Sequence, residues 1–479
     1  MASDPYRSPA SRGRKGGGPE SDQMGFTMKR RRWLTLGSVV VFAAALMTSA
    51  VPAQEATRED HPNIVLILAD DLGYGDLGVF GSPTIDTPRL DRLAAEGVKL
   101  TSFYVASPAC TPSRASLLTG RYPIRSGMNA VLGPDAEKGL PSSEVTLAEL
   151  LGETGYHTSL VGKWHLGDRP AFLPTEHGFD DYFGLLYSND MMPPWVQTKK
   201  PLRLYRGAVE QPGEVDSGTL TTRYTEEAIR VIREQRRQPF FLYLAYSMPH
   251  VPIGSSAAFE GKSAGGRYGD VIEELDWNVG RILDTLRELR LDDRTLVIFT
   301  SDNGPWTNMP SRMLVDDRIR LTDAGTAGPF RGSKGTTWEG GVRVPFIARW
   351  RGRIDPGLVS ADIASALDLL PTLARLAGAA LPAHVPLDGL DIMPLLEGSG
   401  PSPRQDLFYF NDGRLEALRE GQWKLKVEWK KGFSTPVPEL YDLTNDPFER
   451  HNVAGGNPET AERMLNRLVA FAKETGAVR

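Results

Sequence analysis

Four apolar runs of this sequence are each followed by side chains that bind metal ions, carry positive charge or transfer protons. In chain order these side chains are Asp70 and Asp71, Lys163 and His165, His250, and Asp302 and Asn303. Each one alone is also compatible with a turn, a helix cap or a solvated surface charge. Because parallel strands bring their carboxyl ends to one edge of a sheet, we expect the four groups to converge there.

The acidic members of this set offer only oxygen ligands. Three carboxylates and a carboxamide, from Asp70, Asp71, Asp302 and Asn303, suit a hard divalent cation such as calcium or magnesium, rather than zinc or copper. The sequence contains one cysteine and seven histidines. A disulfide framework and a multi-cysteine zinc or iron–sulfur site are therefore excluded.

The remaining members are cationic or proton-donating, and two further basic residues join them. The full set is Arg114, Lys163, His165, His250 and Lys334. Such a ring surrounds an anionic group and supplies acid–base chemistry. Together with a metal ion, it predicts an oxyanion substrate that carries sulfate, phosphate or phosphonate.

The single cysteine, Cys110, lies in the segment S-P-A-C-T-P-S-R-A-S-L-L-T-G-R. Pro112 and the residues that follow predict a helix that starts just after Cys110 and ends at Gly120. A helix N-terminus favours anions, and Arg114 is near enough in sequence to orient this side chain. The alternative is an inert buried thiol at a turn, which the polar neighbours disfavour.

Short apolar runs that alternate with amphipathic stretches must position these residues. Predicted strands cover Asn63–Ala69, Tyr156–Gly162, Pro239–Tyr246, Thr295–Thr300 and Val344–Trp350. Predicted helices start after Thr87 and after Val145, and two more cover Tyr224–Gln235 and Val271–Leu289. Continuous apolarity over such lengths is typical of strands buried on both faces. This pattern predicts an α/β sandwich with a large, mainly parallel sheet.

The last 80 or so residues have a different pattern, in which short strands are joined by tight turns. Strands are expected at Leu407–Phe410, Glu416–Arg419, Trp423–Trp429 and Glu439–Asp442, with a helix over Pro458–Glu474. We therefore expect a catalytic domain over 54–397, a junction rich in Gly, Pro and Ser over Glu397–Pro403, and an α+β subdomain with an antiparallel sheet over 404–479.

The sequence pattern of the N-terminal region predicts a targeting segment. Residues 1–27 are expected to be a disordered extension, and 28–53 have the basic, apolar and small-residue order of a signal peptide. The start codon encodes either Met1 or Met28. The apolar stretch is short for a membrane anchor, so we expect cleavage and export to the periplasm or the exterior. The net charge is −5, with the basic excess confined to this segment, which argues against nucleic acid as a partner.

The segment C-T-P-S-R-A-S-L-L-T-G-R resembles the C-x-P-x-R signature of type I sulfatases. The resemblance covers roughly residues 60–455 and includes N-I-V-L-I-L-A-D-D-L-G-Y-G-D, G-K-W-H-L-G, S-D-N-G, G-S-K-G-T-T-W-E-G-G-V-R-V-P and E-L-Y-D-L-T-N-D-P-F-E. It is similar to the arylsulfatase A and N-acetylgalactosamine-6-sulfatase branch. It implies an alkaline-phosphatase-like fold and hydrolysis of sulfate esters.

The resemblance also implies site roles. A separate maturation enzyme would oxidise Cys110 to Cα-formylglycine. Calcium, with magnesium as the second choice, would be held by Asp70, Asp71, Asp302, Asn303 and the modified residue 110. Arg114 and Lys163 would hold the hydrated aldehyde, Lys163, Lys334 and Ser188 would contact the sulfate, His165 would assist the hydrate, and His250 or Lys334 would protonate the leaving oxygen.

Two alternatives remain beside the sulfatase hypothesis: a phosphonate or phosphate monoester hydrolase, and a catalytically silent protein that binds sulfated glycans. An exo-acting enzyme on a carbohydrate sulfate is preferred, and aryl sulfates are expected to serve as artificial substrates. Residues 191–195 (M-M-P-P-W) form either a substrate pocket wall or part of the core, with a slight preference for the core. The sequence does not determine the oligomeric state.

Overall fold

The computed structural model describes residues 61–134, 136–429 and 437–477. These residues all belong to one compact unit that spans Ala56–Arg479. The expected disordered extension (1–27) and signal peptide (28–53) lie outside the described residues. Within the described part of the chain, no helix is long and apolar enough to cross a membrane.

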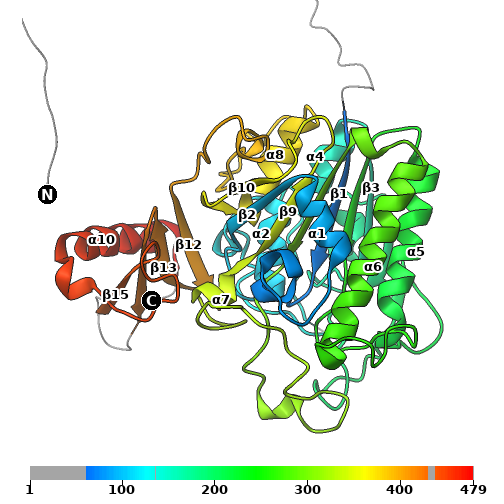
Figure 1. Cartoon of the computed structure of the whole chain (residues 1–479), viewed down its shortest axis with the longest axis horizontal. Helices are drawn as coiled ribbons and strands as arrows, with labels where there is room; N and C mark the ends of the chain where they lie inside the picture. Colours follow the sequence, from blue (N-terminus) through cyan, green and yellow to red (C-terminus); the bar gives the residue numbers. More distant parts are fainter. Residues whose placement is uncertain (1–60, 135, 430–436, 478–479) are drawn as a thin grey trace, which may run out of the picture. The chain divides into compact units, whose positions relative to one another are not determined.

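An 11-stranded sheet forms the centre of this unit (Figure 1). Its strand order is β10-β2-β9-β8-β1-β7-β3-β4-β5-β6, and β11 also pairs with β2. The strands are β1 (Asn63–Ala69), β2 (Val98–Tyr104), β3 (His157–Gly162), β4 (Asp181–Leu185), β5 (Leu204–Arg206), β6 (Val209–Glu210), β7 (Phe240–Ala245), β8 (Thr295–Ser301), β9 (Arg343–Arg349), β10 (Leu358–Ser360) and β11 (Ala364–Ser365). Strands β8, β1, β7, β3 and β4 are parallel to one another, whereas β9 is antiparallel to β2 and β8.

Helices cover both faces of the sheet. The α-helices of the described residues are α1 (Pro88–Ala95), α2 (Cys110–Thr119), α3 (Pro123–Ser126), α4 (Leu147–Glu153), α5 (Ser217–Gln235), α6 (Gly266–Glu288), α7 (Glu339–Val342), α8 (Leu369–Leu376), α9 (Met393–Leu396) and, beside the second sheet, α10 (Pro458–Thr475). Alternate residues of β1 belong to two separate cores, with Leu66 packed on the side of α2, α4 and α8, and Ile67 on the side of α1, α5 and α6. The central strands are thus buried on both faces, as their continuous apolarity predicts.

A second sheet lies in the C-terminal region and is antiparallel throughout. Its strands β12 (Asp406–Asn411), β13 (Arg414–Glu420), β14 (Trp423–Glu428) and β15 (Val437–Asp442) pair in sequence order. Helix α10 packs against this sheet (Figure 1). The register between β12 and β13 shifts at Tyr409/Phe410, which marks a β-bulge.

The predicted architecture, an α/β sandwich with a small antiparallel sheet, is confirmed. A capping box starts helix α4, because Thr146 Oγ1 accepts from Glu149 N and Glu149 Oε2 accepts from Thr146 N. Helix α5 begins seven residues before the predicted Tyr224, and the Asp216 side chain caps it by accepting from Gly218 N. Strand β2 was not predicted because its V-K-L-T-S-F-Y sequence lacks a continuous apolar run.

Candidate active site

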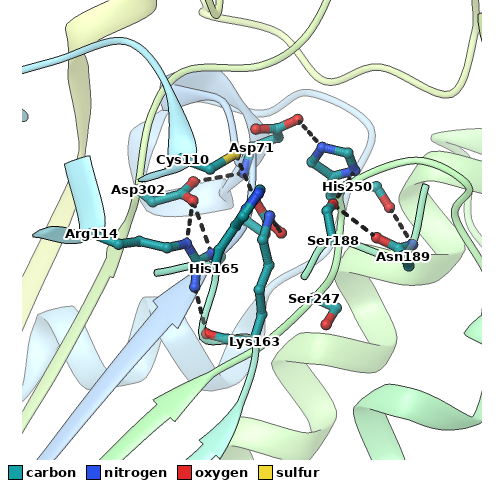
Figure 2. Close-up of polar contacts among 12 residues, drawn as sticks. Asp71, Cys110, Arg114, Lys163, His165, Ser188, Asn189, Ser247, His250 and Asp302 are labelled. Atoms are coloured by element: carbon teal, nitrogen blue, oxygen red, sulfur yellow. Dashed lines mark hydrogen bonds and ion pairs between the residues drawn. The ribbon is translucent and has the colours of Figure 1, made fainter. Parts of the chain in front are cut away.

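The carboxyl ends of four parallel strands carry the predicted polar residues to one place. Asp70 directly follows β1, Lys163 directly follows β3, and Asp302 directly follows β8. His250 lies five residues beyond β7. Cys110 enters from α2, and Figure 2 shows it among these side chains. Lys334, on the loop before α7, completes the cluster through its contact with Asp71.

Each carboxylate of the cluster has one close cationic partner. Lys163 Nζ lies 2.5 Å from Asp70 Oδ2. Lys334 Nζ lies 2.8 Å from Asp71 Oδ2. Arg114 Nη2 lies 2.9 Å from Asp302 Oδ2, and its Nε donates to the same oxygen (Figure 2). Three buried carboxylates are therefore balanced by three cations, of which Arg114 and Lys163 are buried and Lys334 is partly accessible. This arrangement limits the cost of burying charge.

Asp70 and Arg114 also connect the pairs to one another. Arg114 Nη2 lies 3.5 Å from Asp70 Oδ1, and its Nη1 donates to the carbonyl oxygen of Lys163 at 2.8 Å. Burial alone raises the pKa of Asp70, but Lys163, His250 and Arg114 together hold that pKa below its ordinary value. The Asp70 carboxylate is therefore ionised at neutral pH.

Asp71 has a backbone conformation that few non-glycine residues adopt, with φ = 66°. Its amide donates to Asp302 Oδ1 at 3.1 Å, and Asn303 Nδ2 donates to its Oδ1 at 2.7 Å. These contacts hold the strained residue against Asp302 and Asn303, which follow the neighbouring strand β8. Such strain is typical of functional positions.

The cluster has the donor set that a metal ion requires. One candidate ligand atom from each of Asp70, Asp71, Cys110 and His250 lies within 4.8 Å of the others. Asn303 Oδ1 is buried and has no hydrogen-bond partner among the described residues. Three carboxylates with an unpartnered amide oxygen fit a hard divalent cation. The sequence predicts Asp302, and not His250, as a metal ligand. Asp302 lies next to this group, because its Oδ1 accepts a hydrogen bond from the amide of Asp71.

Cys110 is the first residue of α2, one position earlier than the sequence predicts, and its side chain is buried. Gly120 ends the helix with φ = 65°, as expected. The Cys110 thiol lies 3.7 Å from Asp70 Oδ1. Burial raises the pKa of this thiol to about 12, with the lysines opposing the shift. The unmodified cysteine is therefore a neutral thiol at physiological pH and a poor nucleophile.

His165 is buried and neutral at physiological pH. Burial, followed by the charges of Lys163 and Arg114, lowers its pKa well below the ordinary value. Its Nε2 lies 2.9 Å from the carbonyl oxygen of Leu132, so Nε2 carries the proton. The other nitrogen, Nδ1, is buried without a hydrogen-bond partner among the described residues, and its lone pair is free to accept a proton.

His250 faces Asp71 from the other side of the cluster. Its Nδ1 lies 2.6 Å from the Val251 carbonyl oxygen, so Nδ1 carries a proton, and Ser188 Oγ lies 3.2 Å from the same nitrogen. Its Nε2 lies 3.5 Å from Asp71 Oδ2. Asn189, which the sequence analysis did not single out, donates from Nδ2 to the His250 carbonyl oxygen (Figure 2).

An aromatic residue missed by the sequence analysis, Trp306, contacts two members of the cluster. Its ring centroid lies 5.6 Å from that of His250, and Lys334 Nζ lies 4.5 Å from its ring centroid. Trp306 comes three residues after Asn303 in S-D-N-G-P-W, but this position alone does not indicate contacts with His250 and Lys334. Only the fold, however, shows that its ring lies between a histidine and a lysine.

Residues 191–195 divide between the core, the wall of a cavity and the surface. Trp195 is buried in the core, as favoured, whereas Pro193 and Pro194 are exposed. Met191 and Tyr187 line a cavity of about 200 Å³. Tyr187 also packs edge-on against the ring of His165, so this cavity adjoins a wall of the cluster.

A mainly parallel sheet between helical layers, with carboxylates and cations gathered at the carboxyl ends of its strands, defines a hydrolase of alkaline-phosphatase-like fold. The Sulfatase family model matches residues 62–379, and the model for the C-terminal region of N-sulphoglucosamine sulphohydrolase matches residues 332–474. The chain belongs to the sulfatase family, whose members are sulfuric ester hydrolases.

Individual relatives agree with this assignment. The chain is 42% identical to human arylsulfatase A, covering 87% of this chain and 89% of the relative. It is also 42% identical to canine N-acetylgalactosamine-6-sulfatase, covering 90% and 88%. Among solved structures, Ps i-CgsB in complex with k-i-k-neocarrahexaose matches with a TM-score of 0.74 and 31% identity, covering 86% of this chain and 93% of that one.

Proposed function

We propose that this sulfuric ester hydrolase cleaves sulfate monoesters of carbohydrates with a Cα-formylglycine made from Cys110 and a calcium ion bound beside it. One observation carries the proposal: Cys110 lies at the start of α2, 3.7 Å from a carboxylate of a buried cluster of three acid–base ion pairs. The high pKa of the thiol supports a modified residue as the nucleophile, since a neutral thiol attacks sulfur poorly.

The modified residue would supply a hydroxyl group of its hydrate as the nucleophile. Arg114 and Lys163 are placed to hold that group, because both contact Asp70 beside Cys110. Their charges favour the deprotonated hydroxyl over the neutral one. His165, with a free lone pair on Nδ1, is suited to take a proton from the hydrate when sulfate departs.

Asp70, Asp71, Asp302, Asn303 and the modified residue 110 would hold the cation, and magnesium is the second choice. A bound divalent cation would stabilise negative charge on the sulfate oxygens. The three carboxylates and three basic side chains cancel in charge, so a cluster that holds the cation is net positive. This charge favours binding of an anionic ester.

Lys334 and His250 both lie close to Asp71 Oδ2, whereas Asn303 donates to the other oxygen, Asp71 Oδ1. Contact with Asp71 raises the pKa of Lys334 despite its burial, so the amine is protonated. Lys334 or His250 donates the proton that the leaving oxygen needs, and Lys163, Lys334 and Ser188 bind the sulfate oxygens.

Carbohydrate sulfates are favoured as substrates because one relative is a sulfatase named after a sugar and another has a carbohydrate bound in its structure. These are canine N-acetylgalactosamine-6-sulfatase and Ps i-CgsB bound to k-i-k-neocarrahexaose. We also propose exo action, maturation by a formylglycine-generating enzyme, and export directed by residues 28–53. In this proposal 54–397 form the catalytic domain and 404–479 the C-terminal subdomain.

The test is co-expression with a formylglycine-generating enzyme, followed by assays on matched esters. We expect release of sulfate from 4-nitrophenyl sulfate and from defined monosulfated sugars, with much slower turnover of 4-nitrophenyl phosphate and of a phosphonate monoester. Faster phosphate or phosphonate turnover would overturn the choice of substrate. Peptide mass spectrometry that finds an intact thiol at residue 110, with glycan binding but no turnover, would instead support the silent binder.

A further inference from the structure

The end of strand β12 contacts the two chain segments that carry Cys110 and Lys334. The amide of Phe410 donates to the carbonyl oxygen of Ala106 at 2.9 Å, four residues before Cys110. Asn411 Nδ2 donates to the carbonyl oxygen of Gly335 at 3.1 Å, directly after Lys334. The β-bulge at Tyr409/Phe410 immediately precedes both contacts, and bulges commonly redirect side chains next to active sites.

Gly335 joins these two segments to each other. Its amide donates to the carbonyl oxygen of Pro108 at 2.8 Å, two residues before Cys110. Its φ of +80° is a conformation that residues with a side chain rarely adopt. The neighbouring amide of Lys334 donates to the carbonyl oxygen of Pro305 at 3.0 Å, beside Trp306. The backbone at Lys334 is therefore tied to the cysteine loop, to the loop after β8 and to the C-terminal sheet.

The Asn411 side chain is itself held in one orientation. Its Nδ2 also lies 3.2 Å from Glu416 Oε1, and a carboxylate and a carbonyl both require the NH₂ group at this position. Glu416 Oε2 accepts from Thr337 Oγ1 at 2.9 Å, and Lys426 Nζ donates to the same hydroxyl at 2.6 Å. Strands β12, β13 and β14 thus each contribute one side chain to the hydrogen-bond network that holds residues 335–337.

We propose that Asn411 is a positioning residue for Lys334. It fixes the peptide between Gly335 and Thr336, one residue beyond Lys334. Through Gly335 it sets where Lys334 Nζ lies relative to Asp71 and the leaving oxygen of the substrate. This inference rests on the proposed role of Lys334. Because a misplacement of about 1 Å costs a large part of catalytic efficiency, a contact outside the cluster has a measurable effect on turnover.

The experiment is a double-mutant cycle of Asn411→Ala and Lys334→Ala on the full chain, assayed with 4-nitrophenyl sulfate. The matched control is Asn457→Ala, which removes another amide-to-carbonyl hydrogen bond, from Asn457 Nδ2 to the Val453 oxygen at 3.0 Å. Conversion of residue 110 is measured by peptide mass spectrometry for every variant, and rates are expressed per converted molecule. Thermal midpoints show whether Asn411→Ala and Asn457→Ala are equally folded.

We expect Asn411→Ala to lower kcat/KM about tenfold, mostly through kcat, and Asn457→Ala to change it less than about twofold. In the Lys334→Ala background, the additional effect of Asn411→Ala should fall below about twofold, because the two residues act as one unit.

Three outcomes would overturn the inference. If Asn411→Ala is as active as the control while Lys334→Ala is strongly impaired, Asn411 has no positioning role and the proposed function stands. If the tenfold loss persists without Lys334, the effect of Asn411 is not exerted through that lysine. If Lys334→Ala itself turns over normally, the proposed role of Lys334 fails, and the role of Asn411 fails with it.

Discussion

Asp71 and Lys334 are 263 positions apart in sequence, yet Lys334 Nζ lies 2.8 Å from Asp71 Oδ2. This pair is one of three in which each carboxylate of the cluster meets one cation. Removal of one member of a buried pair leaves the other charge without compensation. The members of the cluster therefore depend on one another. Each is best tested by a single substitution, with the same substitution in an exposed ion pair as the control.

Substitution Asp302→Asn should weaken calcium binding and lower kcat at least about a hundredfold, because one ligand charge is lost and Arg114 loses its nearest carboxylate partner. A ligand that binds the folded state raises its stability. Calcium should therefore raise the thermal midpoint of the native protein over that in EDTA, and raise that of the variant much less. Asp316→Asn, at the exposed pair with Arg318, is the control. An equal calcium response in Asp302→Asn would contradict the assignment.

Substitution Cys110→Ser should leave folding intact and abolish turnover. Serine keeps the shape and a donor for the 3.7 Å contact with Asp70 Oδ1, so the thermal midpoint should change little. A serine nucleophile would be left as a stable sulfate ester, and kcat should fall at least about a thousandfold. Native protein produced without the maturation enzyme should be equally inactive. Steady-state turnover by Cys110→Ser at a rate near the native one would refute the need for a modified residue.

Trp306 should contribute to catalysis through Lys334 and His250. Its ring faces Lys334 Nζ at 4.5 Å, a cation–π contact worth about 0.5–2 kcal/mol. Trp306→Ala should therefore lower kcat/KM for 4-nitrophenyl sulfate by about 3- to 30-fold, and Trp306→Phe should lower it less. Trp277→Ala, at an exposed tryptophan on α6, provides the control. Equal activity of Trp306→Ala and the native protein would show that the contact is incidental.

Local sequence signals predicted the parts of the site that follow buried strands. Asp70, Lys163 and Asp302 come directly after apolar runs, and parallel pairing alone brings such residues together. Lys334 follows no predicted strand; its charge alone put it in the predicted ring of basic residues, and its contact with the sulfate was expected from the family resemblance. Trp306 and Asn411 could not be predicted, because their importance depends on contacts with His250 and Gly335 far along the chain.

Strand direction was a further limit. The apolar run at Val344–Trp350 correctly predicted β9, but apolarity is the same for either direction of a buried strand. The antiparallel pairing of β9 with β2 and β8 is fixed by the connections around it. Strand β2, which is antiparallel to β9, gave no clear signal because polar residues interrupt its apolar ones.

His177 should make the protein less stable in acid. Its ring lies 5.8 Å from that of Trp164, and burial lowers its pKa from 6.5 to about 4. Between these two values the unfolded chain binds a proton that the folded chain excludes. Stability is therefore complete above pH 6.5 and falls as the pH drops toward 4, by up to about 1.4 kcal/mol per pH unit.

Urea unfolding of the native protein and of His177→Leu at pH 7 and pH 5 measures this contribution. Leucine cannot titrate and keeps an apolar contact with Trp164, so the loss of unfolding free energy between the two pH values should shrink by about 1–2 kcal/mol. His384→Leu removes an exposed histidine and should leave the pH dependence as it is in the native protein. If His177→Leu loses as much stability as the native protein over this range, His177 is not the group that is kept neutral by burial. The acid sensitivity would then have to come from other buried groups, of which His165, also held neutral, is the first to test.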